Sequence, residues 1–219
     1  MRRIPEPELM EGKEQAKAYA EADFNQANSQ FSRLFRSAFP AFRGEGRVLD
    51  LGCGPGHILM DFARNFPGCT CLGIDGSQAM LDQGLAYVVQ PNASSVTLQC
   101  SCLPFTDDCR TWQVILTNSL LHHLADPGHL GQTIIKCAAP GALVMVMDLF
   151  RPCSEKAAAA LVKKYSGKEP QILQDDFYHS LLAAYRVEEV REQIREQGLD
   201  LQCSKVSDRH LAAWGRISP

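Results

Sequence analysis

The sequence predicts an α/β protein in which a mostly parallel sheet is covered by helices on both faces. Short, continuous apolar runs recur through the middle of the chain, and a segment with helical periodicity separates each run from the next. Strands of a parallel sheet are buried on both faces, so they read as unbroken apolar runs rather than as alternating ones. With 219 residues, 45% of them hydrophobic and 21% charged, the chain can bury a core without disulfides or a metal.

The N-terminal part precedes this pattern. Residues 1–12 carry prolines and mixed charge, and we expect an unanchored tail. From Lys13 to Phe39 apolar residues recur at helical spacing until Pro40 interrupts the pattern. We therefore expect residues 1–44 to form a tail and a helical cap, with the main domain at 45–219.

Five apolar runs then predict strands, and capping residues mark the helices between them. Ser77 is a plausible N-cap, and Asp126 is a cap residue followed by proline at the first helical position. The expected strands are Val48–Leu51, Cys69–Ile74, Val96–Cys100, Val114–Thr117 and Ala142–Met147.

After the fifth strand the pattern breaks. A helical insertion is expected at about 152–185, followed by a helix at Val187–Gln197 that stops at Gly198. Two terminal strands are expected at Leu199–Val206 and His210–Ile217.

The charge balance restricts the partners. The 22 basic and 25 acidic residues, with a pI of about 6.1, argue against a nucleic-acid partner that is bound by neutralising its phosphates. No window approaches the ~18 apolar residues of a membrane span, and the first residues lack the apolar run of a secretory signal. We expect a cytoplasmic protein with no membrane partner.

The nine cysteines form no C-x-x-C motif, which favours reduced thiols. Cys69 and Cys71, and likewise Cys100 and Cys102, are C-x-C pairs in strand-like runs, where alternation places each pair on one face. The favoured interpretation is small buried hydrophobes, and a soft-metal or arsenic site is the alternative. No metal site is expected elsewhere.

The segment Val48–His57 is a buried strand leading into a turn with glycine at every second position and then into a helix. Gly52 and Gly54 allow a ligand to approach the backbone, and the helix start offers free N–H groups. A dinucleotide fingerprint would need glycine at position 57, where this chain has His57. A nucleotide-like ligand is still expected at this strand end.

Asp75 ends the next strand, 23 residues beyond Gly52. A carboxylate at this place can accept both hydroxyls of a ribose. The alternative is an acid that merely caps the helix beside Ser77.

At these residues the chain resembles a class I S-adenosylmethionine-dependent methyltransferase of the type 11/25 kind, over about residues 45–150. The resemblance lies in the glycine loop, the acid at Asp75, Leu103–Phe105, Asn118–Leu124, and Pro140 with Gly141. It implies a Rossmann-like seven-stranded sheet with an antiparallel last strand, S-adenosyl-L-methionine as cofactor and S-adenosyl-L-homocysteine as product.

The resemblance also implies where the cofactor lies. Gln99–Ser101 would face the adenine, although the family commonly has an acid at the position of Gln99, and Asn118 would line the amino-acid end. Independently of the resemblance, Tyr19 and Phe24 lie in a segment that is not needed to complete the sheet, and we expect their rings to cover the sulfonium by cation–π attraction. The alternative is that the aromatic residues of this segment pack on the flank of the sheet, as we expect for Phe31, Phe35 and Phe39. The expected cofactor-binding residues are Tyr19, Phe24, Gly52, Cys53, Gly54, Gly56, His57, Asp75, Gly76, Ser77, Met80, Gln99, Cys100, Ser101, Asn118 and Ser119.

His122 and His123 follow the fourth strand and lie over the methyl group in the family geometry. Either could act as a base, and the alternative is that one packs against the loop. Phe177 and Tyr178 are candidates for substrate binding, or belong to a helix with a solvated polar face. His57 is expected to orient the glycine loop.

Three functions remain open. The leading hypothesis is a methyltransferase acting on a small molecule. An RNA or protein methyltransferase should show a basic surface, for which the only concentration is Lys163–Lys164 with Lys168. The third is a non-catalytic cofactor-binding module. A homodimer is left open.

Overall fold

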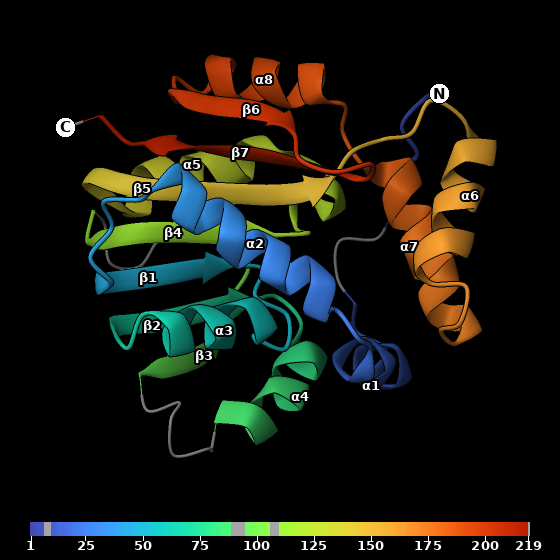
Figure 1. The fold of residues 1–219 in the computed structure, drawn as a ribbon, viewed down its shortest axis with the longest axis horizontal. Coiled ribbons are helices and arrows are strands. Elements are labelled where there is room, and N and C mark those ends of the chain that lie inside the picture. Colours follow the sequence, from blue (N-terminus) through green and yellow to red (C-terminus); the bar gives the residue numbers. More distant parts are fainter. Residues whose placement is uncertain (7–9, 89–94, 106–109, 219) are drawn as a thin grey trace.

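The computed structural model describes residues 1–6, 10–88, 95–105 and 110–218. Its centre is a seven-stranded sheet with the order β3-β2-β1-β4-β5-β7-β6, shown in Figure 1. The strands are β1 (Glu45–Leu51), β2 (Gly68–Asp75), β3 (Val96–Cys100), β4 (Trp112–Asn118), β5 (Ala138–Leu149), β6 (Leu201–Lys205) and β7 (His210–Arg216).

The direction of the strands confirms the predicted sheet. Strands β1 to β5 pair in parallel, whereas β7 runs antiparallel to β5 and β6. In the middle, Val48 of β1 pairs with Cys71 of β2 on one side and with Val114 of β4 on the other. Because β1 lies between β2 and β4, its carboxyl end faces the point where the strand order reverses. Open α/β sheets bind their ligands at such a point.

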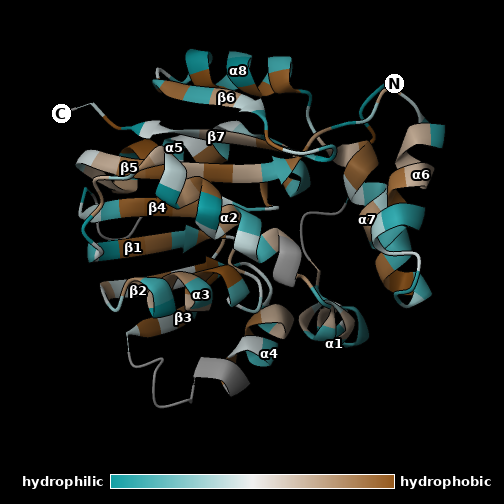
Figure 2. Ribbon diagram, in the orientation of Figure 1, coloured by the Kyte–Doolittle hydropathy of each residue, from teal (hydrophilic) through white to brown (hydrophobic). Residues whose placement is uncertain are grey.

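Helices cover both faces of the sheet, as expected (Figure 1). The helices are α1 (Lys13–Glu21), α2 (Asn25–Ala38), α3 (His57–Asn65), α4 (Gln78–Val88), α5 (Gly128–Cys137), α6 (Glu155–Tyr165), α7 (Gln171–Ala183) and α8 (Val187–Glu196), with a 3-10 turn η1 (Leu121–His123). Colouring by hydropathy shows that the central strands are predominantly apolar, while the helices also carry polar residues (Figure 2).

Aromatic packing holds α2 and α3 on their face of the sheet. Phe31 and Phe35 are fully buried, and Phe39 is 6% exposed, which confirms that these residues pack on the sheet. The rings of Phe35 and Phe62 meet edge to face, with centroids 4.9 Å apart. Such pairs stabilise by about 0.5–1.5 kcal/mol beyond the burial of their area.

The predicted helix starts are confirmed with one shift. The hydroxyl of Ser77 accepts a hydrogen bond from the N–H of Met80 at 3.2 Å, as an N-cap does. Asp126 accepts from the N–H of Gly128 at 2.8 Å. Pro127, however, precedes the first residue of α5 as its N-cap, although its φ of −63° and ψ of −17° are helical and Asp126 makes the side-chain hydrogen bond.

Three helices gather beyond the carboxyl ends of the parallel strands. Figure 1 shows α1, α6 and α7 together at this end, with α6 and α7 forming the insertion after β5. The insertion has its own small core, in which Ala158, Leu181 and Leu182 pack with Leu149. These helices form a wall over the edge of the sheet where a ligand is expected.

The N-terminal residues 1–6, here called the strap, are anchored, so the expectation of an unanchored tail was wrong for them. The N–H of Ile4 donates to the carbonyl of Leu182 at 3.1 Å. Arg3 donates to three carbonyls, those of Ala183, His122 and Leu124. Its guanidinium also lies 4.1 Å from the centre of the Tyr185 ring. Most of these partners lie near the end of α7, more than 170 residues away in sequence.

The cysteine pairs differ from one another. Cys69 and Cys71 are buried on one face of β2, as predicted, and burial raises their pKa values to about 11 and about 12. Cys100 and Cys102 are exposed, so the prediction of burial was wrong for that pair. The reason is that β3 is an edge strand and Cys102 lies beyond its end.

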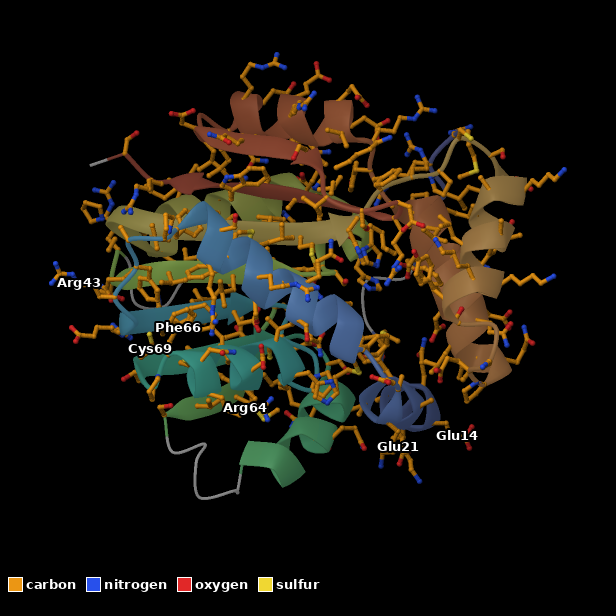
Figure 3. The ribbon with its side chains drawn as sticks, in the orientation of Figure 1. Glu14, Glu21, Arg43, Arg64, Phe66 and Cys69 are labelled. Atoms are coloured by element: carbon orange, nitrogen blue, oxygen red, sulfur yellow. The ribbon has the colours of Figure 1, made fainter. Side chains whose placement is uncertain are left out.

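The charged surface lies on the outer sides of the elements. Glu14 and Glu21 extend outward from α1, and Arg43 extends from the loop before β1 (Figure 3). None of the helices in the part of the chain that the structure describes is long and apolar enough to cross a bilayer.

Candidate active site

A cavity of about 590 Å³ opens between the carboxyl ends of β1 and β4 and the wall formed by α1 and α7. This volume is typical of small-molecule sites, and the place is where an α/β sheet binds its ligands. Among the expected residues, the cavity is lined by Tyr19, Phe24, Gly52, Cys53, Gly54, His57, Met80, Asn118, Ser119, His122, His123 and Phe177.

The other expected residues do not line this cavity. Tyr178 is absent from its wall, so the structure separates it from Phe177. Those outside the lining are Gly56, Asp75, Gly76, Ser77, Gln99, Cys100, Ser101 and Tyr178. Most of them cluster next to the cavity, at the ends of β2 and β3.

The glycine loop adopts a backbone that needs glycine. Gly52, Gly54 and Gly56 have φ angles of 69°, 54° and 81°, in the left-handed region. A Cβ on Gly52 would lie 2.6 Å from the side chain of Leu120, whereas one on Gly54 would meet only the end of the Met80 side chain, at 3.3 Å. The strand-turn-helix reading of Val48–His57 is confirmed by this geometry.

Asp75 holds the glycine loop against the next turn. One carboxylate oxygen accepts the N–H of Gly54 and the other accepts the N–H of Ser77, both at 2.8 Å. Burial raises the pKa of Asp75, and these two N–H groups oppose the rise. Each carboxylate oxygen keeps a further lone pair, so capping the turn and accepting ligand hydroxyls are compatible.

The end of β3 lies directly beside Asp75. Gln99 pairs with Ile74 and Cys100 with Asp75, and the N–H of Ser101 donates to the Asp75 carbonyl at 2.9 Å. The residues expected around the adenine therefore adjoin the residue expected at the ribose.

Two buried acceptors line the cavity near the glycine loop. Oδ2 of Asp50 and Oδ1 of Asn118 accept no hydrogen bond from the residues that the structure describes. Burial, with Asp75 nearby, raises the pKa of Asp50 well above its ordinary value. Beside them Ser119 has a φ of 57°, a strained conformation for a residue with a side chain. Unsatisfied buried acceptors and local strain are features of ligand sites.

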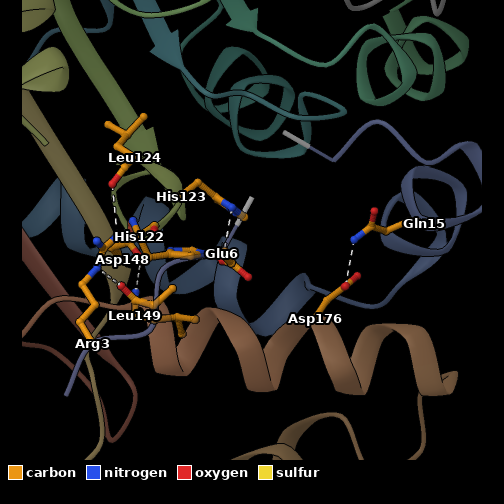
Figure 4. A network of polar contacts seen from close by, with 10 residues as sticks. Arg3, Glu6, Gln15, His122, His123, Leu124, Asp148, Leu149 and Asp176 are labelled. Atoms are coloured by element: carbon orange, nitrogen blue, oxygen red, sulfur yellow. Dashed lines mark hydrogen bonds and ion pairs between the residues drawn. The ribbon is translucent and has the colours of Figure 1, made fainter. Parts of the chain in front are cut away.

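Tyr19 and Phe24 lie together at the cavity wall. Their ring centroids are 4.7 Å apart, and burial, with Asp75 and Asp148 nearby, raises the pKa of Tyr19 to about 12. The amide of Gln15 donates to Asp176 at 2.9 Å and ties α1 to α7, as Figure 4 shows. The aromatic pair thus lines the same cavity as the glycine loop.

His122 is held by a buried carboxylate. Its Nδ1 lies 2.5 Å from Oδ1 of Asp148, at the end of β5, and both residues are almost fully buried. Burial is the largest single effect and disfavours both charged forms, but the attraction and the hydrogen bond between the two groups, together with smaller contributions from their neighbours, outweigh it. The pKa of His122 is therefore raised and that of Asp148 lowered.

Glu6 of the strap completes a compact cluster with both histidines (Figure 4). Its Oε1 lies 3.5 Å from Nε2 of His122 and 3.3 Å from Nδ1 of His123. Burial raises the pKa of Glu6, and the charge of His122 opposes the rise.

Glu6, Asp50 and Asp148 also line or adjoin this cavity and were not predicted from the sequence. A signal existed for the two aspartates, because each is a single acid next to an otherwise apolar strand segment, and buried charges need a partner. Glu6 had no such signal, because it lies in a segment with neither periodicity nor apolar runs.

Comparisons with known proteins agree with this architecture. A family model described as "Methyltransferase domain" matches residues 19–204. A ubiquinone biosynthesis O-methyltransferase from Caulobacter sp. (strain K31) is 32% identical over 148 residues, which are 64% of this chain and 54% of the relative. A trans-aconitate 2-methyltransferase from Mycobacterium tuberculosis is 28% identical over 126 residues, which are 54% of this chain and 43% of the relative. The chain spans about half the length of the curated relatives it matches.

Solved structures share the fold. A SAM-dependent methyltransferase from Aquifex aeolicus superposes with a TM-score of 0.69 at 17% identity, covering 93% of this chain and 98% of the other. A plantazolicin methyltransferase in complex with a desmethyl analogue and SAH gives a TM-score of 0.69 at 15% identity, covering 94% and 91%. With a family model that matches most of its length and this fold, the chain belongs to the class I S-adenosylmethionine-dependent methyltransferase family.

Proposed function

We propose that this protein transfers the methyl group of S-adenosylmethionine to a small-molecule acceptor bound in the cavity. The observation that carries the proposal is that one cavity joins the glycine loop to the paired histidines and to the wall of α1 and α7. A cofactor at the loop and an acceptor at the histidines would therefore share one enclosed space. The relatives named above, whose names refer to ubiquinone biosynthesis and to trans-aconitate, support a small acceptor.

The cofactor end fits the residues around the glycine loop. The free acceptors of Asp50 and Asn118 would bind the ammonium group of the methionine part, and the glycine-loop backbone would lie against it. Asp75 would accept the ribose hydroxyls, and Gln99–Ser101 would flank the adenine. When bound, the cofactor supplies a methyl group on a sulfonium, which is both electrophile and leaving group.

The acceptor end belongs to the histidines and to α7. His122 and His123 are our candidates for orienting the reacting group and taking its proton, and Asp148 holds His122 in place. Phe177 contributes to the wall, whereas Tyr178 lies outside it. In-line positioning and exclusion of water supply the rest of the catalysis.

The charges at the cavity disfavour an RNA acceptor. The lining has one arginine, Arg209, against five acids, namely Glu6, Asp23, Asp50, Glu169 and Asp176. A site that follows a phosphate backbone should have the opposite balance. The basic surface considered above is also partly neutralised, because Lys164 pairs with Asp208 at 2.7 Å.

The test is a reaction with methyl-labelled S-adenosylmethionine and fractionated metabolite extract, read by mass spectrometry. We expect label in a small molecule, with Asp75→Ala reducing the yield and Asp82→Ala, an exposed acid on α4, leaving it unchanged. Label found only in RNA or protein would refute the small-molecule acceptor. Cofactor binding without any labelled product from extract, RNA or protein would favour a non-catalytic module.

A further inference from the structure

We propose that Glu6, His122 and His123 form a binding site for a divalent transition metal of the zinc type. Their ligand atoms all lie within 4.8 Å of one another. Oε1 of Glu6 is 3.5 Å from Nε2 of His122 and 3.3 Å from Nδ1 of His123. In a tetrahedral zinc site with bonds of about 2.0–2.2 Å, neighbouring ligand atoms are about 3.3–3.6 Å apart. Two of the three spacings therefore already suit a metal.

The orientation of His122 supports this assignment. Its Nδ1 lies 2.5 Å from Asp148, so a proton held there leaves the lone pair of Nε2 directed at Glu6. Asp148 is itself fixed, since its Oδ1 accepts the N–H of Leu149 at 2.6 Å. A carboxylate behind a histidine is the arrangement that orients metal-binding imidazoles and increases their basicity.

Glu6 is also placed as a ligand. Its Oε1 is buried and accepts no hydrogen bond from any residue within the described ranges. The ring nitrogens of His122 and His123 face this oxygen at 3.5 Å and 3.3 Å without hydrogen-bond geometry, and a cation bound among the three atoms would satisfy the buried carboxylate. Arg3, three residues earlier, donates to the carbonyls of His122 at 3.0 Å and Leu124 at 3.2 Å, which joins the strap to the histidine turn.

The site would have an open position. All three side chains line the cavity, so an oxygen or nitrogen of a bound molecule could become the fourth ligand. Three protein ligands with an open position are typical of catalytic rather than structural zinc sites. Only this role rests on the proposed methyl transfer, since the binding of a metal can be measured without any reaction.

The cysteines are the competing metal ligands. Their pairs were the soft-metal candidate from the sequence, but in the described part of the chain only Glu6, His122 and His123 bring three potential ligand atoms together. Thiolate and imidazole ligands give cobalt different spectra, so one experiment separates them.

The experiment is a titration of the metal-free, full-length protein with Co²⁺, followed by visible absorption, and then displacement by Zn²⁺. We expect one Co²⁺ per chain, with the absorption of a nitrogen- and oxygen-ligated ion. Glu6→Gln and His123→Ala should each weaken binding by at least 100-fold, and Asp148→Asn by about 10–100-fold. His129→Ala is the matched control, because this histidine lies on the surface beside Asp126. It should bind like wild type.

Thermal unfolding gives a second readout. A metal that binds only the folded chain raises the midpoint in wild type and His129→Ala, but not in Glu6→Gln. Glu6→Gln and His123→Ala alter different elements, so failure of one to fold leaves the other to decide. Absence of Co²⁺ binding, a thiolate charge-transfer band, or unchanged binding in a folded variant of the triad would overturn the proposal. A protein that binds S-adenosylmethionine but no metal would refute this inference and leave the methyltransferase assignment intact.

Discussion

Replacing Asp75 by alanine tests the cofactor assignment most directly. The carboxylate accepts two backbone hydrogen bonds of 2.8 Å, from Gly54 and Ser77, and is our candidate for binding the ribose. Hydrogen bonds to a charged group stabilise by about 1.5–3 kcal/mol each. Because the carboxylate would bond both the ribose and the loop, the substitution should affect cofactor binding and folding stability separately. Loss of the ribose contacts should weaken cofactor binding by about 1–3 kcal/mol, roughly 5–150-fold in Kd. Loss of the loop contacts should lower the free energy of unfolding.

Calorimetry with S-adenosylmethionine and S-adenosylhomocysteine measures the first effect, and urea unfolding measures the second. Asp75→Asn keeps one acceptor oxygen and should lie between wild type and Asp75→Ala in both measurements. Asp82→Ala is the control. It removes an exposed acid of α4 whose side chain accepts a hydrogen bond from Gln78, and it should change neither cofactor affinity nor the free energy of unfolding. Wild-type affinity in a folded Asp75→Ala variant would refute the ribose assignment. Tighter binding of NAD than of S-adenosylmethionine would refute the choice of cofactor.

Three further changes test the loop, the aromatic cover and one buried histidine. Gly54→Val should abolish cofactor binding, measured by calorimetry, because the φ of Gly54 is 54° and the branched side chain would occupy the ligand's space. Circular dichroism should show that the variant is folded, and full cofactor binding in the folded variant would contradict contact between the loop and the cofactor. Tyr19→Leu should weaken the binding of S-adenosylmethionine by about 2–30-fold and that of S-adenosylhomocysteine less, because only S-adenosylmethionine carries a sulfonium cation that can contact the ring. Tyr19→Phe should bind both ligands nearly as wild type does, and equal losses for the two ligands in Tyr19→Leu would exclude the cation–π contact. Burial, helped by Arg209, lowers the pKa of His210 from 6.5 to about 4, so the unfolded chain gains a proton first as the pH falls. The free energy of unfolding should therefore drop by up to about 3 kcal/mol between pH 6.5 and 4, and denaturant titrations should show a smaller drop in His210→Gln.

Local patterns were enough to predict the sheet and the glycine loop. Each parallel strand carries its own apolar run, and the turn after β1 needs glycine at positive φ, so both are visible in short stretches of sequence. The position of Asp75 next to Gly54 also follows from the strand order, because β1 and β2 are parallel neighbours and end at the same edge of the sheet. The burial of Cys100 and Cys102 was mispredicted because an alternating apolar run does not reveal that its strand lies at the edge of the sheet.

The histidine end of the cavity could be predicted only in part, because its partners come from distant segments. His122 and His123 follow β4, Asp148 ends β5, and Glu6 belongs to the strap that is held by Arg3. A single acid next to the apolar run of β5 indicates that a buried partner exists, but not which residue it is. The strap shows the limit most clearly. Its position depends on carbonyls at the ends of η1 and α7. Every residue has a backbone carbonyl, so the sequence does not reveal which carbonyls accept these hydrogen bonds. The segment that looked least structured in the sequence thus delivers a carboxylate to the histidines, and this is why Glu6→Gln is an informative variant for the metal site.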